Sequence, residues 1–320
     1  FAEDPHQLEK LLDPAVRSKL SHVRKVVLMS QEGEFEKPDA RGRTRVTLDE
    51  VLPKGHGDHN WVMMFEDLRA AGKNWINTNA LDEIAREVTP DHVFTIVYTS
   101  GTTGAPKGVV LLHRAIVFET RAVQEALAVN PSDEQLLFLP LAHIFARVLS
   151  WVSINRGCTI TFAESIAKLV PNMQETRPTF VGAVPRVYEK AYAKIQSNFA
   201  EKRKKPVARK LIDWALGGGH RASQERQAGR EPSGMLAFQV KLANKLVFSK
   251  IQATFGGRLR FFVSGGAPLS GDISRFFHSV GVLILEGYGL TETTAATHVN
   301  RFDRLRFGTV GPALPGIEVK

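Results

Sequence analysis

Short apolar runs alternate with amphipathic segments along most of the chain after its first quarter. Apolar runs of about four to eight residues are typical of buried strands, whereas apolar positions three and four residues apart are typical of helices. The pattern therefore predicts strands at residues 93–98, 107–113, 135–140, 158–162, 179–184, 259–263 and 281–285. Helices are predicted between most of them, at residues 113–128, 144–156, 185–200, 236–254 and 271–280.

Continuous apolar strands separated by helices predict an α/β fold, with a mainly parallel sheet that has helices on both faces. The leading region is less regular. Residues 1–22 read as a helix, a strand starts at Val23, residues 31–60 are charged and rich in glycine and proline, and a short helix starts at Trp61. Residues 88–92 (VTPDH) predict a break before the α/β region.

Polar and glycine-rich residues follow several of the predicted strands. They occupy residues 99–108, 140–143, 185–186, 264–268 and 286–293. Ligands of open parallel sheets collect beyond the carboxyl ends of the strands. We therefore expect these segments to meet at one edge of the sheet and to form a binding site there.

The loop YTSGTTGAPKG, residues 98–108, has the composition of an anion cradle but is not a Walker loop. A Walker loop requires Gly-Lys-Ser/Thr at its end, whereas here Lys107 lies between Pro106 and Gly108. Glycines allow close backbone approach, and hydroxyls, amides and a lysine attract anions. The hydroxyls are those of Thr99, Ser100, Thr102 and Thr103. The alternative is a flexible glycine–threonine surface turn.

Composition narrows the class of protein only slightly. The net charge of +9 fits nucleic acid, an anionic membrane or phosphorylated small molecules, and no aromatic-and-basic motif favours nucleic acid. Cys158 is the single cysteine, so an internal disulfide is impossible and a reducing, cytoplasmic location is expected. No apolar run approaches the roughly 18 residues of a membrane span.

With two further motifs, the chain resembles the adenylate-forming superfamily of acyl-CoA synthetases, peptide-synthetase adenylation domains and luciferases. Besides residues 98–108, the motifs are SGGAPLS at 264–270 and GYGLTET at 287–293. Finer segments are similar to those of long-chain fatty acyl-CoA synthetases. These are LPLAHIFARV at 139–148, VGAVPRVYEK at 181–190, KLIDWAL at 210–216 and residues 245–270.

The resemblance covers residues 88–320 well and residues 1–87 loosely. It implies that residues 1–320 form an incomplete large domain, with 88–320 as its ATP- and acyl-binding core. The first strands, the ribose-binding motif, the hinge and the small C-terminal domain with its catalytic lysine are expected to lie outside the sequence. By itself the chain is then expected to bind ATP weakly, to make little acyl-adenylate and to expose apolar sheet edges.

The implied reaction is a two-step ligation. A fatty acid carboxylate attacks the α-phosphorus of ATP to give acyl-adenylate and pyrophosphate, and the thiol of coenzyme A then displaces AMP. Charge neutralisation and positioning dominate such chemistry. The resemblance assigns phosphate contacts to Thr99, Ser100, Gly101, Thr102, Thr103, Gly104, Lys107 and Thr291, Mg²⁺ binding to Glu292, and adenine contacts to Gly265, Gly266, Ala267, Tyr288 and Gly289.

Three further assignments follow from the resemblance, each with a plainer alternative. His143 is placed near the reacting carboxylate, or else it is a packed histidine with one hydrogen bond. Val181, Gly182 and Ala183 are placed along an acyl tunnel, or else they form an ordinary buried strand. The basic segment 201–230 is a solvated face, or else it contacts an anionic membrane.

The sequence thus predicts a long-chain fatty acid–CoA ligase that uses ATP, Mg²⁺ and coenzyme A. One alternative is a ligase that passes the acyl group from the adenylate to a carrier protein. The other, for the chain alone, is a non-catalytic module that binds a nucleotide or an acyl group. Nucleic acid is not expected as a partner.

Overall fold

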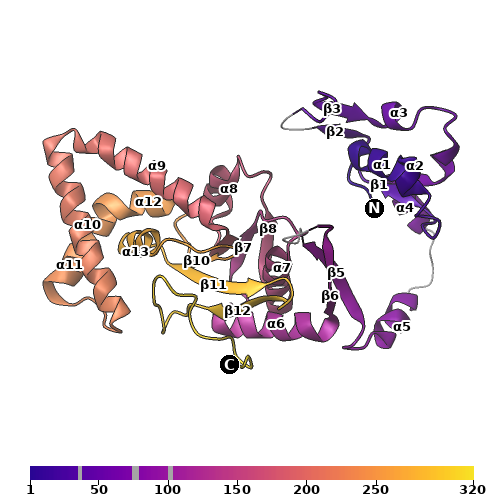
Figure 1. Cartoon of the computed structure of the whole chain (residues 1–320). Coiled ribbons are helices and arrows are strands. Elements are labelled where there is room, and N and C mark those ends of the chain that lie inside the picture. Colours follow the sequence, from indigo (N-terminus) through magenta and orange to yellow (C-terminus); the bar gives the residue numbers. More distant parts are fainter. Residues whose placement is uncertain (35–37, 74–78, 100–103) are drawn as a thin grey trace. The chain divides into compact units, whose positions relative to one another are not determined.

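The computed structural model describes residues 1–34, 38–73, 79–99 and 104–320 (Figure 1). The chain divides into two compact units, Phe1–Val88 and Thr89–Lys320. Each unit is described by itself below.

The first unit is built around a small apolar cluster that includes Leu8, Leu28 and Trp61. The Arg17 guanidinium lies 3.7 Å from the centroid of the Trp61 ring, at a distance typical of a cation–π contact. The helices are α1 (Pro5–Leu12), α2 (Pro14–Arg17), α3 (Leu48–Val51), the 3₁₀ turn η1 (Gly57–Asn60), α4 (Phe65–Gly72) and α5 (Ala80–Glu87). The strands are β1 (Val26–Leu28), which is parallel to β4 (Val62–Met64), and β2 (Glu32–Glu34), which is antiparallel to β3 (Arg45–Thr47).

This unit corrects two predictions. The expected helix over residues 1–22 is two short helices, because Asp13 caps a new helix whose first residue is Pro14 and proline favours the first helical position. The helix expected from Trp61 begins only at Phe65, because residues 62–64 pair with β1 as a strand.

The second unit contains the predicted α/β region. Its strands are β5 (Val93–Thr99), β6 (Lys107–Leu112), β7 (Glu134–Leu137), β8 (Thr159–Phe162), β9 (Phe180–Ala183), β10 (Phe261–Ser264), β11 (Ile284–Leu290) and β12 (Ala295–Val299). Its helices are α6 (His113–Ala126), α7 (Ile144–Arg156), α8 (Leu169–Thr176), α9 (Pro185–Arg203), α10 (Pro206–Gln227), α11 (Gly234–Ala243), the π-helical turn η2 (Asn244–Phe248), α12 (Ser249–Thr254) and α13 (Gly271–Ser279).

In the described part of this unit, six strands form one sheet in the order β12-β11-β10-β9-β7-β8. All neighbours are parallel except β12, which returns antiparallel to β11. The prediction of a mainly parallel α/β fold is therefore confirmed. Because β10 is inserted between β9 and β11 and parallel to both, the carboxyl ends of these three strands lie side by side at one edge.

Alternate residues of the central strands enter two different hydrophobic clusters. Val181 and Phe262 pack with α9, α10, α12 and α13 on one face of the sheet. Phe180, Phe261 and Leu285 pack with α6 and α7 on the other. This period of two is what a strand buried on both faces produces, so helices cover both faces, as predicted.

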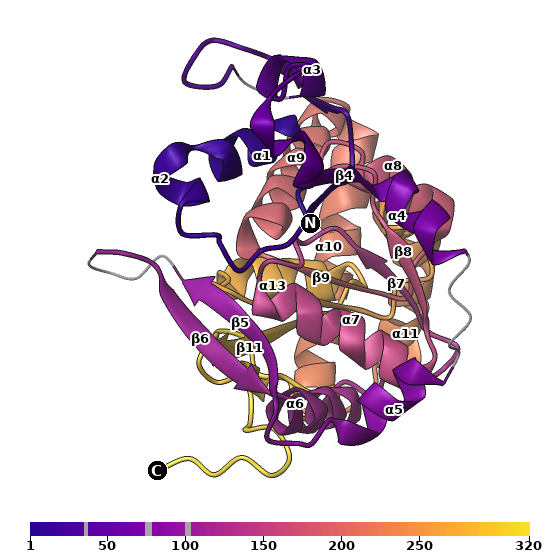
Figure 2. The same cartoon turned by 90° about the vertical axis from the view of Figure 1, so that its right-hand side faces the viewer.

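The predicted strand at 93–98 does not join this sheet. It forms a separate antiparallel hairpin with β6, with Thr99 paired to Lys107 at the tip (Figure 2). On this hairpin Val97 and Leu111 are buried, whereas Ile96, Tyr98 and Val110 are exposed.

The helical predictions need two corrections. The helix expected over 236–254 is interrupted by the π-helical turn η2. The long helix α10 was not predicted, because the run Gly217–Gly219 reads as a break. In the structure Gly219 allows close packing, since a Cβ there would lie 2.2 Å from the carbonyl oxygen of Ser279.

A buried polar network fixes the amino ends of β7, β9 and β10. The Asp133 carboxylate is 1% exposed and forms an ion pair with Arg260. It accepts hydrogen bonds from the Asn130 amide (2.9 Å) and the Thr179 hydroxyl (2.7 Å). Burial opposes ionisation, but these partners outweigh it and hold the pKa of Asp133 below its usual value.

We therefore predict that Asp133→Asn lowers the free energy of unfolding by about 1–3 kcal/mol at neutral pH. A lowered pKa contributes stability above the unfolded value of 3.8 and loses it as the pH falls through the folded value. The difference in free energy of unfolding between Asp133→Asn and the wild type should therefore become smaller as the pH is lowered. Denaturant unfolding over a pH series tests this, with the exposed Asp303→Asn as control. A pH-independent loss, or an equal loss in the control, would contradict the assignment.

Candidate functional site

A cavity of about 760 Å³ lies at the carboxyl ends of β9, β10 and β11. The β5–β6 hairpin, helices α6 and α7 and the β11–β12 hairpin complete its walls. Its inner wall is apolar and consists of residues from α6 and α7. They include Val123, Leu127, Ile144, Phe145, Val148 and Leu149.

Residues from four of the five segments predicted to meet line the same cavity, whereas Pro185 and Arg186 do not line it. The lining residues include Thr99 and Lys107 from the β5–β6 hairpin, His143 before α7, Gly265 and Gly266 after β10, and Tyr288, Gly289, Thr291 and Glu292 from β11 and its turn. The expectation that the strand ends meet at one site is thus met for these residues. Ser100, Gly101, Thr102 and Thr103 lie outside the described residues.

Two predicted residues of these motifs do not line the cavity. Ala267 follows Gly266 but is exposed, with its side chain outside the lining. Gly104 lies in the loop before Lys107 and has φ +103°, a conformation that glycine adopts without strain.

Ser264 at the end of β10, with Gly265 and Gly266 in the turn that follows, lines the cavity. The Ser264 side chain is fully buried, and its Oγ has no hydrogen-bond partner among the described residues. Gly266 has φ +84°, so it turns the backbone away from the strand direction. A buried hydroxyl without a partner is costly, and Ser264 pairs in register with Ala183, whose side chain lies on the opposite face of the sheet from the cavity.

The β11–β12 hairpin depends on one close backbone contact. A Cβ at Gly289 would lie 1.4 Å from the carbonyl oxygen of Ala295, so no other residue fits there. The register shifts between Tyr288 and Gly289. Gly289 therefore allows the close approach of β12 to the end of β11.

Thr291 and Glu292 lie in the turn that this contact closes. Thr294 and Ala295 both have positive φ angles, of 63° and 100°, which are unfavourable for residues with a Cβ. The Thr293 hydroxyl accepts a hydrogen bond from the Leu290 amide at 2.9 Å. The turn presents Thr291 and Glu292 to the cavity, and Glu292 is exposed.

Buried carboxyl groups that the sequence argument missed hold the loops on either side of β11. Glu119 of α6 is 1% exposed and accepts a hydrogen bond from the Ala296 amide at 2.7 Å. Glu286 of β11 accepts one from the Leu269 amide at 3.3 Å. Burial raises the pKa of Glu119 to about 8 and also raises the pKa of Glu286. Their hydrogen-bond partners are 177 and 17 residues away in the sequence, so no local pattern identifies these two carboxyl groups.

Arg147 is a further residue that the sequence argument did not assign. Its guanidinium donates hydrogen bonds to the Leu141 carbonyl and to the Thr95 hydroxyl. It therefore ties the hairpin that carries Thr99 and Lys107 to the start of α7. His143, which precedes this helix, is exposed at the cavity and is not a packed core histidine.

The three residues predicted to line an acyl tunnel do not lie on the same face of the sheet. Val181 and Ala183 are fully buried in the cluster on the opposite face of the sheet from the cavity. Gly182 points to the cavity side, where a Cβ would lie 2.1 Å from Leu149 Cδ1 and 3.4 Å from Phe145 Cζ. Consecutive strand residues alternate between faces, so the three cannot line one channel together. Leu149 and Phe145 form the wall in front of Gly182.

A family model described as AMP-binding enzyme matches residues 8–320. The chain belongs to the AMP-binding enzyme family. Among curated members, long-chain-fatty-acid–CoA ligase FadD15 of Mycobacterium tuberculosis is 36% identical over 231 residues, which are 69% of this chain and 36% of the ligase. Long chain acyl-CoA synthetase 3 of Arabidopsis thaliana is 35% identical over 331 aligned residues, which cover 100% of this chain and 44% of the synthetase.

Among solved structures of the family, the inhibitor-bound N-terminal domain of FACL13 from Mycobacterium tuberculosis shares the fold. The TM-score is 0.56 at 22% identity, over 94% of this chain and 60% of that domain. This likeness supports the α/β architecture. The chain spans well under half the length of the curated relatives named above.

We predict that Glu119→Gln changes the pH dependence of stability. A carboxyl group whose folded pKa is raised from 4.5 to about 8 keeps its proton when folded and loses it on unfolding. Wild-type stability should therefore fall as the pH rises through this window. Glutamine can still accept a hydrogen bond from the Ala296 amide but does not titrate. Between pH 4.5 and about 8, the free energy of unfolding of the variant should therefore rise relative to that of the wild type by on the order of 2–4 kcal/mol.

Denaturant unfolding at several pH values measures this difference. Glu125→Gln, at an exposed position of the same helix, is the matched control and should follow the wild type. A Glu119→Gln curve parallel to the wild-type curve would show that Glu119 is ionised in the folded protein.

Proposed function

We propose that this chain carries the adenylate-forming site of a long-chain fatty acid–CoA ligase. The observation that carries the proposal is the cavity itself, which joins a polar mouth to an apolar inner wall. Lys107, Thr291 and Glu292 gather at the mouth, and Phe145 and Leu149 belong to the apolar wall. An activated fatty acid has the same division into a charged phosphate end and an alkyl chain.

The residues present fit an adenine nucleotide. Lys107 supplies a positive charge, and Thr99 and Thr291 supply hydroxyls at the phosphate end. Tyr288 is 51% exposed, so part of its ring is available to stack on a base. The backbone of Gly265 and Gly266 is available to the rest of the nucleoside.

In the proposed reaction, a carboxylate oxygen of the fatty acid bonds to the α-phosphorus of ATP, and pyrophosphate leaves. The thiol of coenzyme A then bonds to the acyl carbon, AMP leaves and the thiol proton passes to solvent. Lys107 and the hairpin loop would neutralise charge on the leaving pyrophosphate. The apolar wall would hold the alkyl chain and exclude water from the mixed anhydride.

We place Mg²⁺ at Glu292. Among the described residues no group of three or more histidine, cysteine, aspartate or glutamate side chains could hold a metal. A single carboxylate suits Mg²⁺, which usually takes one or two carboxylates together with substrate phosphates and water. When bound, the ion would neutralise phosphate charge.

Coenzyme A is the acyl acceptor that we favour over a carrier protein. The relatives that match this chain bear the names of CoA ligases and acyl-CoA synthetases. No helix in the described part of the chain has the length and apolar character needed to traverse a bilayer. The membrane contact predicted for residues 201–230 is also proposed.

The direct test of the proposal is formation of an acyl thioester. The full-length product of the gene would be incubated with ATP, Mg²⁺, coenzyme A and fatty acids of several chain lengths, and acyl-CoA and AMP would be measured. We expect both products in equal amounts, most rapidly with long chains. AMP release without thioester would contradict coenzyme A as acceptor, and no AMP with any fatty acid would contradict the proposed ligation.

We predict that Lys107→Ala lowers kcat/KM for ATP by at least about tenfold, because a fixed charge beside the phosphates is removed. Steady-state kinetics with varied ATP measures the effect. Lys54→Ala, which removes an exposed lysine of the first unit, is the control. Unchanged kcat/KM for ATP in Lys107→Ala would show that the β5–β6 hairpin does not contribute to the phosphate site.

Gly182→Ala should impair long acyl substrates more than short ones. The added Cβ forces Leu149 away, and the cavity is the open space beside it. We expect kcat/KM to fall about tenfold for a long chain, with little change for a short one. The double variant Gly182→Ala, Leu149→Ala restores the space and should recover the long chain. Equal losses for both substrates without recovery would mean that Gly182 serves only core packing.

A further inference from the structure

Helices α10 and α11 pack together on the side of the second unit remote from β7 and β8 (Figure 1). The inner face of α10 is anchored to α13. The Ser223 hydroxyl and His278 Nδ1 are hydrogen-bonded at 2.7 Å, and Gly219 packs against the backbone of Ser279. The outer face of the pair is therefore held in a fixed orientation.

This outer face carries an unusual number of exposed apolar side chains. Met235 and Phe238 of α11 are 81% and 64% exposed, and Val207 at the start of α10 is 81% exposed. Water around such side chains is unfavourable at about 25 cal/mol for each Å² of apolar surface. The α10–α11 surface is defined here by Val207, Trp214, Met235, Phe238, Leu242 and Leu246, all more than a third exposed.

Helical spacing places these residues on common faces. Met235, Phe238 and Leu242 are separated by three and four residues, and Val207 and Trp214 by seven, so each set forms a stripe. Gln239 joins the two helices beside these stripes. Its amide donates to the Trp214 carbonyl at 2.9 Å and accepts from the Arg221 guanidinium at 2.6 Å.

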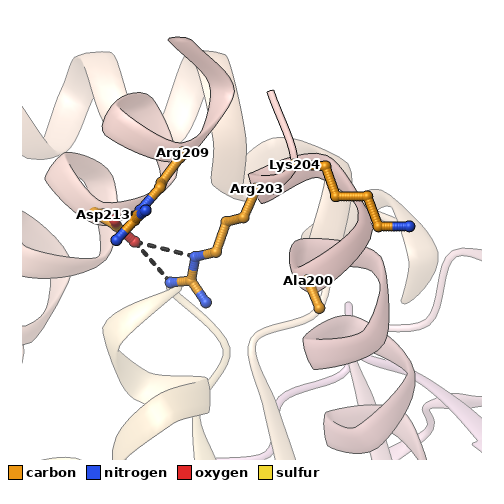
Figure 3. Close-up of a pocket in the computed structure, with 5 residues that line it drawn as sticks. All are labelled: Ala200, Arg203, Lys204, Arg209 and Asp213. Atoms are coloured by element: carbon orange, nitrogen blue, oxygen red, sulfur yellow. Dashed lines mark hydrogen bonds and ion pairs between the residues drawn. The ribbon is translucent and has the colours of Figure 1, made fainter. Parts of the chain in front are cut away.

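Basic residues surround the stripes. Residues 201–245 contain eleven lysines and arginines but four acidic residues. Several arginines are paired. Figure 3 shows Arg203 bonded to Asp213, with Arg209 beside the same carboxylate, at a cavity of about 460 Å³ between α9 and α10. Lys204 lines that cavity and points away from Asp213.

The lysines next to the apolar stripes are not neutralised. Within the described ranges, Lys202, Lys205, Lys210, Lys241 and Lys245 form no ion pair with an acidic side chain. Lys241 and Lys245 alternate with Phe238 and Leu242 along the exposed side of α11 and η2. Lysine side chains can lie along an apolar surface with their ammonium groups at a polar boundary.

We propose that the α10–α11 surface docks on an anionic lipid membrane. Phe238, Leu242 and Met235 would enter the boundary between headgroups and acyl chains, and the unpaired lysines would contact lipid phosphates. A second copy of the chain fits the α10–α11 surface less well, because the unpaired lysines of the two copies would face and repel one another. The basic surround matches the charge of anionic headgroups, each basic residue contributing attraction near such a surface.

The role of membrane docking rests on the proposed function: because long-chain fatty acids partition into membranes, docking would bring the proposed ligase to its substrate. Its test is independent of that function, because vesicle binding needs no turnover. Loss of thioester formation with intact vesicle binding would overturn only the proposed ligase. Failure to bind vesicles with intact thioester formation would overturn only the docking surface.

The experiment is vesicle co-sedimentation of the full-length product of the gene at low ionic strength. Vesicles of phosphatidylcholine alone are compared with vesicles of phosphatidylcholine and phosphatidylglycerol. We expect binding to the anionic vesicles, weak binding to the neutral ones and release by salt. Phe238→Ser and the double variant Lys241→Glu, Lys245→Glu should each lower the partition coefficient for anionic vesicles by at least about tenfold.

Matched controls separate this surface from general stickiness and charge. Phe162→Ser removes a phenylalanine of similar exposure, 62%, on β8. Lys10→Glu with Lys54→Glu changes the net charge equally at exposed positions of the first unit. Both controls should bind as the wild type does. The proposal would be overturned if the control variants lost as much vesicle binding as the test variants, or if the wild type bound neutral and anionic vesicles equally. It would also be overturned if the wild type bound no vesicles but formed a dimer that Phe238→Ser dissociates.

Discussion

The contact between Gly289 and the backbone of Ala295 is the constraint on which the candidate site depends. Because no Cβ fits between β11 and β12 at this point, β12 can fold back against the end of β11. That return forces the intervening residues into a tight turn, with two consecutive positive φ angles. The turn presents Thr291 and Glu292 at the same cavity as the β5–β6 hairpin.

Such a turn is strained and needs support from its surroundings. Glu119 supplies it by accepting a hydrogen bond from the Ala296 amide, from the buried side of α6. Glu286 supports the turn after β10 in the same way, through the Leu269 amide. Burial raises the pKa of both carboxyl groups, to about 8 for Glu119. The charged side chains that line the cavity, Lys107 and Glu292, are both exposed.

Much of this arrangement could be predicted from local sequence patterns. Strands such as 179–184 and 259–263 are short apolar runs, and their carboxyl ends meet because the sheet is parallel. The long helix α10 could not be predicted from propensity, because Gly217–Gly219 weakens its pattern, while the close approach of Ser279 that explains Gly219 is a tertiary contact.

Long-range contacts also explain the other failures. The pairing of Glu119 with Ala296 spans the second unit, so Glu119 reads as an ordinary helix residue. The strand at 93–98 was assigned to the parallel sheet because an apolar run does not reveal its partner strand. Three successive tunnel residues were assigned to one wall although a strand sends alternate side chains to opposite faces, and only Gly182 faces the cavity side.

Hydrogen–deuterium exchange with a long-chain acyl sulfamoyl adenosine, a stable analogue of the acyl-adenylate, would test the central claim most directly. Amides that become ordered or shielded on binding exchange more slowly. The account predicts slower exchange in Gly265–Gly266, in β11 from Gly287 to Leu290 and in β12, with no change in α10 or α11. Slowing confined to other elements, or none at a saturating concentration, would contradict the assignment of this cavity to the adenylate.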